Sequence, residues 1–168
     1  MQRRLFLRQS FLSLAALGGT ATPLFAAGWK EGMTVPGLGQ YGLEGSLPNL
    51  KGKVVYLDFW ASWCGPCKIS FPVLNQWQES LGSKGFTVLA VSVDEKAEAM
   101  QAFLAKTHVT FPVVRDAAHK LVAAADVTTM PTAFLLDRSG TIRHVHSGFR
   151  KQDEAPLAEK IHALLGKS

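Results

Sequence analysis

The segment DFWASWCGPCK, residues 58–68, connects a predicted strand to a predicted helix and carries the only two cysteines of the 168-residue chain. It overlaps the end of VVYLDFW, 54–60, a run of β-branched and aromatic residues typical of a strand covered on both faces. A helical pattern then runs from Gly65 to about Leu81. Pro72 interrupts this pattern, and because proline lacks a backbone N–H group we expect a kink there.

Two residues separate Cys64 from Cys67. In the chain-entropy model a disulfide across so short a loop stabilises a fold by only about 2 kcal/mol, against about 3 kcal/mol for a loop of about fifteen residues. A structural zinc site takes four protein ligands, and the chain has neither a second cysteine pair nor a His-x-x-x-His motif. We therefore favour redox chemistry over a structural disulfide or a zinc site.

The place of Cys64 at the start of the predicted helix favours a thiolate over a thiol, because free N–H groups and the helix dipole meet there. Lowering a thiol pKa by about one to two units corresponds to about 1.4 to 2.7 kcal/mol. Cys64 is thus the predicted nucleophile. Cys67, one turn further on, is the predicted resolving cysteine, which breaks the mixed disulfide. Pro66 lies in the first turn, where its missing donor costs little.

The rest of the chain alternates between segments with a strand-like hydrophobic pattern and segments with a helical one. Residues 28–53 are rich in Gly and Pro and indicate a loop or a short irregular hairpin. Further strands are predicted at 86–93, 110–114, 132–137 and 141–147, and further helices at 95–108, at 120–126 and around Leu157, Ile161, Leu164 and Leu165. Pro112 favours an edge position for the third strand, and the last two strands form a hairpin. This order predicts an α/β fold with a central mixed sheet flanked by helices on both sides.

Residues 1–27 have the profile of a signal peptide, and 28–168 form the predicted globular domain. Arg3, Arg4 and Arg8 precede a mainly apolar segment, and RRLFLR resembles a twin-arginine export signal. An ordinary secretory signal and an uncleaved anchor remain alternatives. Removing the three arginines lowers the basic residues from 18 to 15, against 13 acidic ones, which leaves a net charge too small to favour nucleic-acid binding.

Three segments in order resemble the thioredoxin superfamily. They are DFWASWCGPCK followed by Pro72, VSVDE at 91–95 and VTTMPTAFLLDRSG at 127–140, within a resemblance that covers about residues 45–150. The helix, strand and helix between Glu95 and Asp126 form an extra insertion that resembles the exported TlpA/ResA-like branch. Members of that branch reduce disulfides of envelope proteins, and several serve cytochrome c maturation or copper-centre assembly. The resemblance implies a thioredoxin-like fold and a thiol-disulfide oxidoreductase.

The resemblance also implies a substrate site beside the cysteines. Pro131 matches the cis-proline of the family, the alternative being an ordinary proline that starts a strand. The main chain on either side of it would pair with a substrate strand. The substrate-binding residues implied are Trp63, Gly65, Pro66, Met130, Pro131 and Thr132. Trp60 and Trp63 are expected to pack around the active site, and Trp63 to cover part of the cysteine pair. The Gly-Pro dipeptide between the cysteines departs from many envelope relatives, so their substrates do not transfer.

Asp58, six residues before Cys64, matches the buried aspartate of thioredoxin. In an apolar strand its pKa should rise, which suits it to accept a proton from Cys67. Ala90 stands where thioredoxin has the lysine that partners this aspartate. The alternative is a carboxylate at the strand end, exposed to water.

His144 and His146 share one face of a predicted strand and, with Met130, raise the question of a copper site. Two histidines at this spacing on an exposed strand are more often solvated, so no metal site is predicted. No cofactor is expected, because the redox-active disulfide carries the chemistry.

We thus expect a monomeric periplasmic enzyme that reduces protein disulfides with electrons from a membrane thiol donor, because oxidising compartments maintain no soluble reducing pool. Three alternatives remain. The enzyme acts as an oxidant that installs disulfides, as a thiol peroxidase, or as a metal chaperone that uses Cys64 and Cys67 as ligands. The peroxidase is disfavoured by Ala61, which stands where peroxiredoxin-type sites have a threonine.

Overall fold

The run VVYLDFW forms the central strand of a five-stranded sheet, and all seven of its residues are buried. The computed structural model describes residues 28–166, so the predicted signal peptide lies outside the described residues. The strands are β1 Val54–Trp60, β2 Phe86–Ser92, β3 Val113–Arg115, β4 Thr132–Leu136 and β5 Ile142–Ser147. The helices are α1 Gly65–Leu81, α2 Ala97–Leu104, α3 Lys120–Ala125 and α4 Glu154–Leu165, with short 3-10 helices η1 Leu38–Tyr41, η2 Gly82–Lys84 and η3 Lys151–Asp153.

The sheet is mixed, as predicted, with the strand order β3-β2-β1-β4-β5. β1, β2 and β3 run parallel, whereas β4 is antiparallel to β1 and forms a hairpin with β5. The parallel strands are joined by helical crossovers, and the carboxyl ends of β1 and β2 therefore meet at one edge of the sheet. The segment that contains the cysteines begins at this edge.

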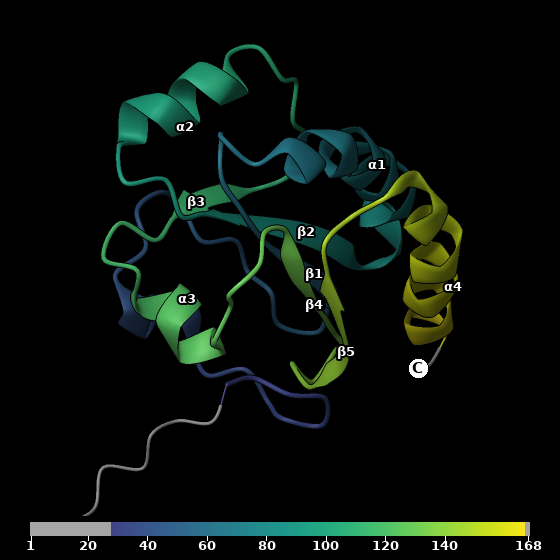
Figure 1. Ribbon diagram of the computed structural model, residues 1–168. Helices are drawn as coiled ribbons and strands as arrows, with labels where there is room; N and C mark the ends of the chain where they lie inside the picture. The colour runs from purple at the N-terminus through teal and green to yellow at the C-terminus, as the bar shows by residue number, and fades with distance from the viewer. Residues whose placement is uncertain (1–27, 167–168) are drawn as a thin grey trace, which may run out of the picture.

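Aromatic contacts show which helices cover each face of the sheet. On one face Trp77 of α1 packs against Tyr56, with ring centroids 5.6 Å apart, and Phe71 packs against Trp60 at 4.7 Å. On the opposite face Trp29 packs against Phe134 at 5.3 Å. Figure 1 shows α1 and α4 together on one side of the sheet and α3 on the other. Helices therefore lie on both faces, as the sequence predicts.

The insertion contains the expected helix, strand and helix, but all three are shorter than predicted, α3 by one residue only. α2 spans Ala97–Leu104 rather than 95–108, and β3 begins at Val113, after Pro112. A proline has no N–H group to donate to a ladder, so its exclusion from the strand follows from its chemistry. β3 is an edge strand, as predicted. No helix within residues 28–166 is long and apolar enough to cross a bilayer.

The segment before β1 is a loop and not a hairpin, the two forms that the sequence left open. It contains η1 and makes two isolated bridges to distant parts of the chain, Thr34 with Thr141 and Glu44 with Arg115. Its backbone groups thus pair with the far ends of the sheet instead of with each other.

Candidate active site

The two cysteines form a disulfide at the N-terminus of α1, with an S–S distance of 2.03 Å. Cys64 is the N-cap residue of the helix, and its Sγ accepts a hydrogen bond from the backbone N–H of Cys67 at 3.2 Å. Pro66 occupies the first turn, as expected. Cys67 is fully buried and Cys64 is only 4% exposed, whereas Gly65 and Pro66 between them are exposed. Of the two cysteines, only Cys64 therefore retains contact with solvent.

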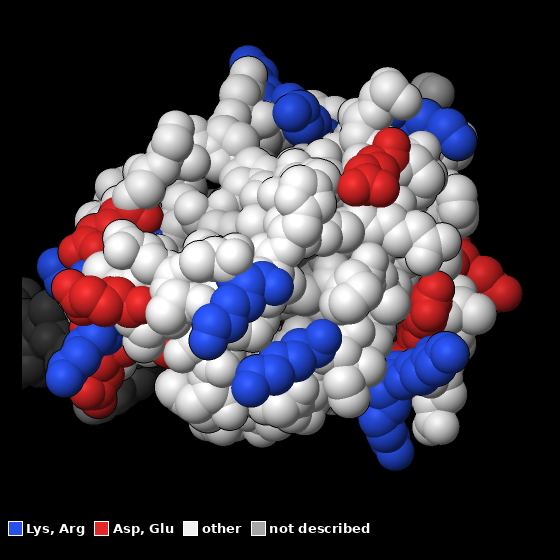
Figure 2. Space-filling view, turned by 90° about the horizontal axis from the view of Figure 1, so that it is seen from above, with Lys and Arg blue, Asp and Glu red and all other residues white. Residues whose placement is uncertain are grey.

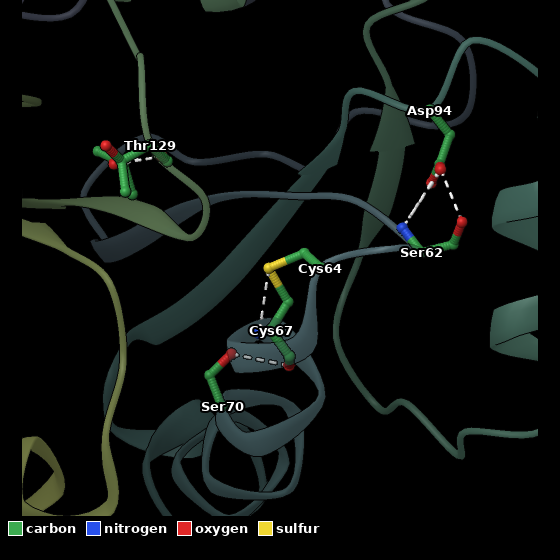
Figure 3. The surroundings of a disulfide bond; sticks show 7 residues. Ser62, Cys64, Cys67, Ser70, Asp94 and Thr129 are labelled. Atoms are coloured by element: carbon green, nitrogen blue, oxygen red, sulfur yellow. Dashed lines mark hydrogen bonds between the residues drawn. A yellow bond between two sulfur atoms is a disulfide. The ribbon is translucent and has the colours of Figure 1, made fainter.

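A buried carboxylate holds the loop that leads from β1 to Cys64 (Figure 3). Asp94, at the end of β2, accepts hydrogen bonds from the backbone N–H of Ser62 at 3.0 Å and from its hydroxyl at 2.7 Å. The hydroxyl of Ser92 donates to the same carboxylate at 2.8 Å. Asp94 belongs to VSVDE, one of the segments that resemble the family, but no role is predicted for it from the sequence. An acidic residue at the end of a buried strand was the available signal.

Trp63 does not pack into the protein, contrary to the prediction, because its side chain is 69 % exposed. Trp60 is fully buried as predicted, between Phe71 and Phe103. Ile69, on the first turns of α1, is also largely exposed. Figure 2 views the molecule from above, and on this face charged side chains of both signs are scattered among uncharged ones. Two large apolar side chains thus reach solvent close to the disulfide in the sequence.

The Met130–Pro131 peptide bond is cis, as the resemblance implies. The carbonyl of Pro131 accepts a hydrogen bond from the N–H of Gly148 at 2.7 Å. The Thr132 hydroxyl donates to the carbonyl of Thr129, labelled in Figure 3, at 2.8 Å. Within the described part of the chain, the N–H and C=O groups of Met130 form no hydrogen bond. This main chain is therefore available to another strand.

A hollow of about 480 Å³ connects the two halves of the site. Trp63 and Ser62 line it on the side of the cysteine loop, and Met130 lines it on the side of the cis-proline. Of the substrate-binding residues assigned from the sequence, Trp63 and Met130 line this hollow. Gly65 and Pro66 are exposed at the start of α1, whereas Pro131 and Thr132 are buried.

Asp58 lies in β1 on the face covered by α1, between Tyr56 and Trp60, and is only 1 % exposed. The alternative of an exposed carboxylate is therefore wrong. Its neighbours in the adjacent strands are Ala90 and Ala133, so no basic side chain stands beside it in the sheet. Burial raises the pKa of Asp58 well above its usual range, since water no longer solvates the charged form. Its Oδ2 has no hydrogen-bond partner among the described residues.

His144 and His146 are half-buried rather than solvated, which corrects the prediction. Nδ1 of His144 lies 3.2 Å from a carboxylate oxygen of Glu31, and Nε2 of His146 lies 3.5 Å from Asp153. The packing of α4 and η3 over this face explains the burial. Within residues 28–166, no cluster of three or more His, Cys, Asp or Glu side chains could hold a metal ion.

A cysteine pair at the start of a helix, on a mixed sheet and near a cis-proline, defines a thiol-disulfide oxidoreductase of thioredoxin-like fold that acts on protein disulfides. The chain belongs to the Redoxin family, whose model matches residues 20–161.

Relatives of known name support this assignment. The chain is 36% identical, over 155 residues, to the thiol-disulfide oxidoreductase ResA of Bacillus subtilis, covering 88% of this chain and 87% of the relative. It is 31% identical to ResA of Geobacillus kaustophilus, covering 91% and 92%. The crystal structure of a protein from Chlorobium tepidum described as thiol:disulfide interchange protein DsbE matches with a TM-score of 0.69 and 46% identity, covering 70% of this chain and 84% of that one.

Proposed function

We propose that the protein is exported and reduces disulfides of envelope proteins through the Cys64–Cys67 dithiol. The observation that carries the proposal is the place of Cys64, which caps α1 beside the exposed side chain of Trp63 and next to buried Cys67. A sulfur at this position meets the N–H groups and the dipole of the helix, both of which favour the attacking thiolate.

In the proposed cycle, the thiolate of Cys64 attacks one sulfur of a client disulfide, and the other client sulfur leaves as a thiolate. Cys67 then loses its proton and attacks Sγ of Cys64, which releases the first client sulfur. The client gains two electrons and the enzyme is left with its internal disulfide. A thiol donor in the membrane returns two electrons and restores the dithiol.

Asp58 is the proposed proton acceptor for Cys67. Both residues are buried, and α1 packs over β1 on either side of Asp58 through Phe71 and Trp77. A carboxyl whose pKa is raised by burial is a better base near neutral pH than an ordinary aspartate. The absence of a lysine beside it, with Ala90 in that place, leaves the carboxylate without a charge partner in the sheet.

The client binds across the hollow between Trp63 and Met130 in this proposal. The unpaired main chain of Met130 adds one strand of the client by backbone hydrogen bonds, next to Pro131 and Thr132. Trp63 supplies apolar contact area, and the exposed backbone at Gly65 and Pro66 leaves room for the client close to Cys64. This pairing would hold a client disulfide near the nucleophile without reading a particular side-chain sequence.

Export, the periplasmic location and a monomeric state are parts of the same proposal. The arginine-rich start and apolar segment of residues 1–27 support export, and so does the resemblance to the exported TlpA/ResA-like branch. Within that branch, cytochrome c maturation and metal-centre assembly are the client processes that we favour.

A trapping experiment in cells tests the proposal. In Cys67→Ser the mixed disulfide on Cys64 cannot be resolved, so we expect a lasting covalent complex with envelope proteins, separable on non-reducing gels and identifiable by mass spectrometry. The matched control is Cys64→Ser, which keeps one cysteine but lacks the nucleophile and should trap nothing. Complexes only with cytoplasmic proteins would refute export to the envelope.

The direction of electron flow is decided by the reduction potential of the Cys64–Cys67 pair. For a reductase we expect a value near that of thioredoxin, about −270 mV, rather than that of the oxidant DsbA, about −120 mV. Equilibration with glutathione or dithiothreitol buffers measures it. A value close to that of DsbA would assign the protein to disulfide formation instead.

A further inference from the structure

Three buried side-chain polar atoms lack a hydrogen-bond partner within residues 28–166: Oδ2 of Asp58, Nε1 of Trp60 and Nε2 of His146. Buried polar groups are nearly always paired, by protein or by ordered water. Asp58 and Trp60 are two residues apart in β1 and therefore share a face of the sheet. This is the face on which α1 packs, and His146 belongs to it as well.

The strand register places His146 in a lateral row with Asp58. Asp58 pairs with Ala133 across β1 and β4, and Ala133 pairs with His146 across β4 and β5. Directly opposite residues of antiparallel strands point to the same face. The two backbones are about 10 Å apart, since each step across the sheet is about 5 Å. Within the sheet, the small side chain of Ala133 is the one that separates Asp58 from His146 in this row.

His146 connects this row to the surface. Its Nε2 is buried, yet its side chain as a whole is 22% exposed, so its solvent contact lies elsewhere on the ring. Asp153 of η3 lies 3.5 Å from Nε2 with a side chain that is 18% exposed. An imidazole with one buried nitrogen and an accessible edge can take a proton on one side and release it on the other.

The other charged groups around His146 come from every element packed there. On β5 the ring of His144 lies 6.2 Å from that of His146. Burial lowers the pKa of His144, and the charge of Lys160 on α4 lowers it further. From η3 and the residue before it, Asp153 and Arg150 form an ion pair at 4.0 Å.

Tyr56 of β1 lies two residues before Asp58 on the same face of the sheet. Burial raises the pKa of Tyr56, and the charges of Asp58 and Asp153 raise it further. Tyr56 thus lies near both Asp58 and Asp153.

We propose that His146, assisted by Asp153, is the exit path for the proton that Asp58 takes from Cys67. The inference rests on the proposed function of Asp58. Cys67 gives its proton to the Asp58 carboxylate and attacks Sγ of Cys64, and the client thiolate leaves. The Asp58 carboxylic acid passes the proton through a bridging water to Nε2 of His146, which restores the carboxylate. The imidazolium, whose Nε2 lies 3.5 Å from Asp153, releases the proton to bulk water, from which the client thiolate takes one up.

His146→Asn tests the path, with His144→Asn as the matched control, because His144 is a half-buried neighbour on the same face that pairs with Leu135 and not with Ala133. Reduced full-length protein is mixed with dithiobis(nitrobenzoate). The first release of thionitrobenzoate reports the attack by Cys64, and the second reports resolution by Cys67. In dilute buffer at pH 7 we expect His146→Asn to slow only the second release, by about tenfold, below the 10²–10⁴-fold typical of direct acid–base groups.

Two further measurements separate a proton path from a structural role. Added imidazole should restore the second release in His146→Asn, because a small base can replace a missing proton carrier but cannot repair a distorted fold. The double variant with Asp58→Asn should be no slower than Asp58→Asn alone, because both changes interrupt one path. If His146→Asn does not fold, His146→Gln takes its place in the same comparison.

The outcomes distinguish the two proposals. If Asp58→Asn leaves the second release unchanged, the proposed role of Asp58 fails, and the path fails with it. If Asp58→Asn slows that release but His146→Asn matches His144→Asn, or imidazole does not restore the rate, the path is overturned while the role of Asp58 stands.

Discussion

The two cysteines differ in environment although only two residues separate them. Cys64 caps α1, and its sulfur accepts a hydrogen bond from the backbone N–H of Cys67. Cys67 itself is fully buried, one turn further along the helix. In the reduced protein we expect iodoacetamide at pH 7 to modify Cys64 at least about tenfold faster than Cys67, a difference of about 1.4 kcal/mol. Peptide mass spectrometry over a time course measures both rates.

The same alkylation in concentrated urea is the control for this difference. Unfolding removes the helix terminus and the burial, so the two rates should become similar. Equal rates in the folded protein, or faster modification of Cys67, would contradict the assignment of Cys64 as nucleophile.

Asp58 and Trp63 show which features of single residues could be predicted from the sequence and which could not. The burial of Asp58 was predictable, because a carboxylate inside an unbroken apolar strand has no exposed face to occupy. That Ala90 lies beside it was implied only by the resemblance to thioredoxin. The exposure of Trp63 was not predictable, because a large aromatic residue usually packs inside. Its direction depends on the turn that the bonds from Ser62 to Asp94 impose, and these join residues 32 positions apart.

The loop between β1 and α1 is an element without regular structure that Asp94 holds in place. Asp94→Ala leaves the N–H and the hydroxyl of Ser62 without their acceptor, and hydrogen bonds to a charged group contribute about 1.5–3 kcal/mol each to stability. We expect the free energy of unfolding to fall by about 2–4 kcal/mol. We also expect the reactivity difference between the two cysteines to shrink. Urea unfolding and the alkylation assay measure the two effects.

Asp116→Ala is the matched control for this change. Asp116 is an equally buried carboxylate, but it accepts the N–H groups of Lys120 and Val122 at the start of α3 and none from the cysteine loop. It should lower stability without altering the reactivity of Cys64. If both variants changed that reactivity alike, the effect would come from general loosening of the fold and not from the loop.

Element types followed from the sequence more reliably than element ends. The alternation of strand and helix patterns is set by which residues are buried, and every predicted strand and helix within residues 28–166 is present. The end of β3 was not predictable, because Arg115 is held there by Glu44, with backbone pairing in both directions and an ion pair of 2.7 Å. A contact between residues 71 positions apart cannot be recognised from the local sequence pattern. The row from Asp58 to His146 was not predictable for the same reason, since it forms only when β4 lies between β1 and β5.

Two carboxyl groups make the stability of the whole molecule depend on pH in opposite directions. Burial raises the pKa of Asp137, but hydrogen bonds from the side chains of Ser139 and Arg143 and from two backbone N–H groups outweigh it and lower the pKa to about 2. The unfolded chain therefore takes up this proton first as the pH falls, and the stabilisation is lost between about pH 4 and pH 2. Above pH 4 the contribution of Asp137 is constant.

Asp58 changes the free energy of unfolding above pH 4. Because its pKa is raised, the folded protein still holds a proton there that the unfolded chain has released. Stability conferred by the neutral form must therefore decline as the pH rises from about 4 through the pKa of the folded state.

Asp58→Asn removes this decline, since the amide cannot ionise. We expect the oxidised variant and the oxidised wild type to unfold with similar free energies near pH 4. At pH 8 the variant should be more stable by about 1–3 kcal/mol, the cost of a buried polar group without a partner. Urea unfolding across this range gives the difference directly, and other titrating groups cancel because both proteins contain them. A difference that stays constant from pH 4 to pH 8 would mean that the Asp58 carboxyl is as well solvated in the folded protein as in the unfolded chain, and the base proposed for Cys67 would lose its physical basis.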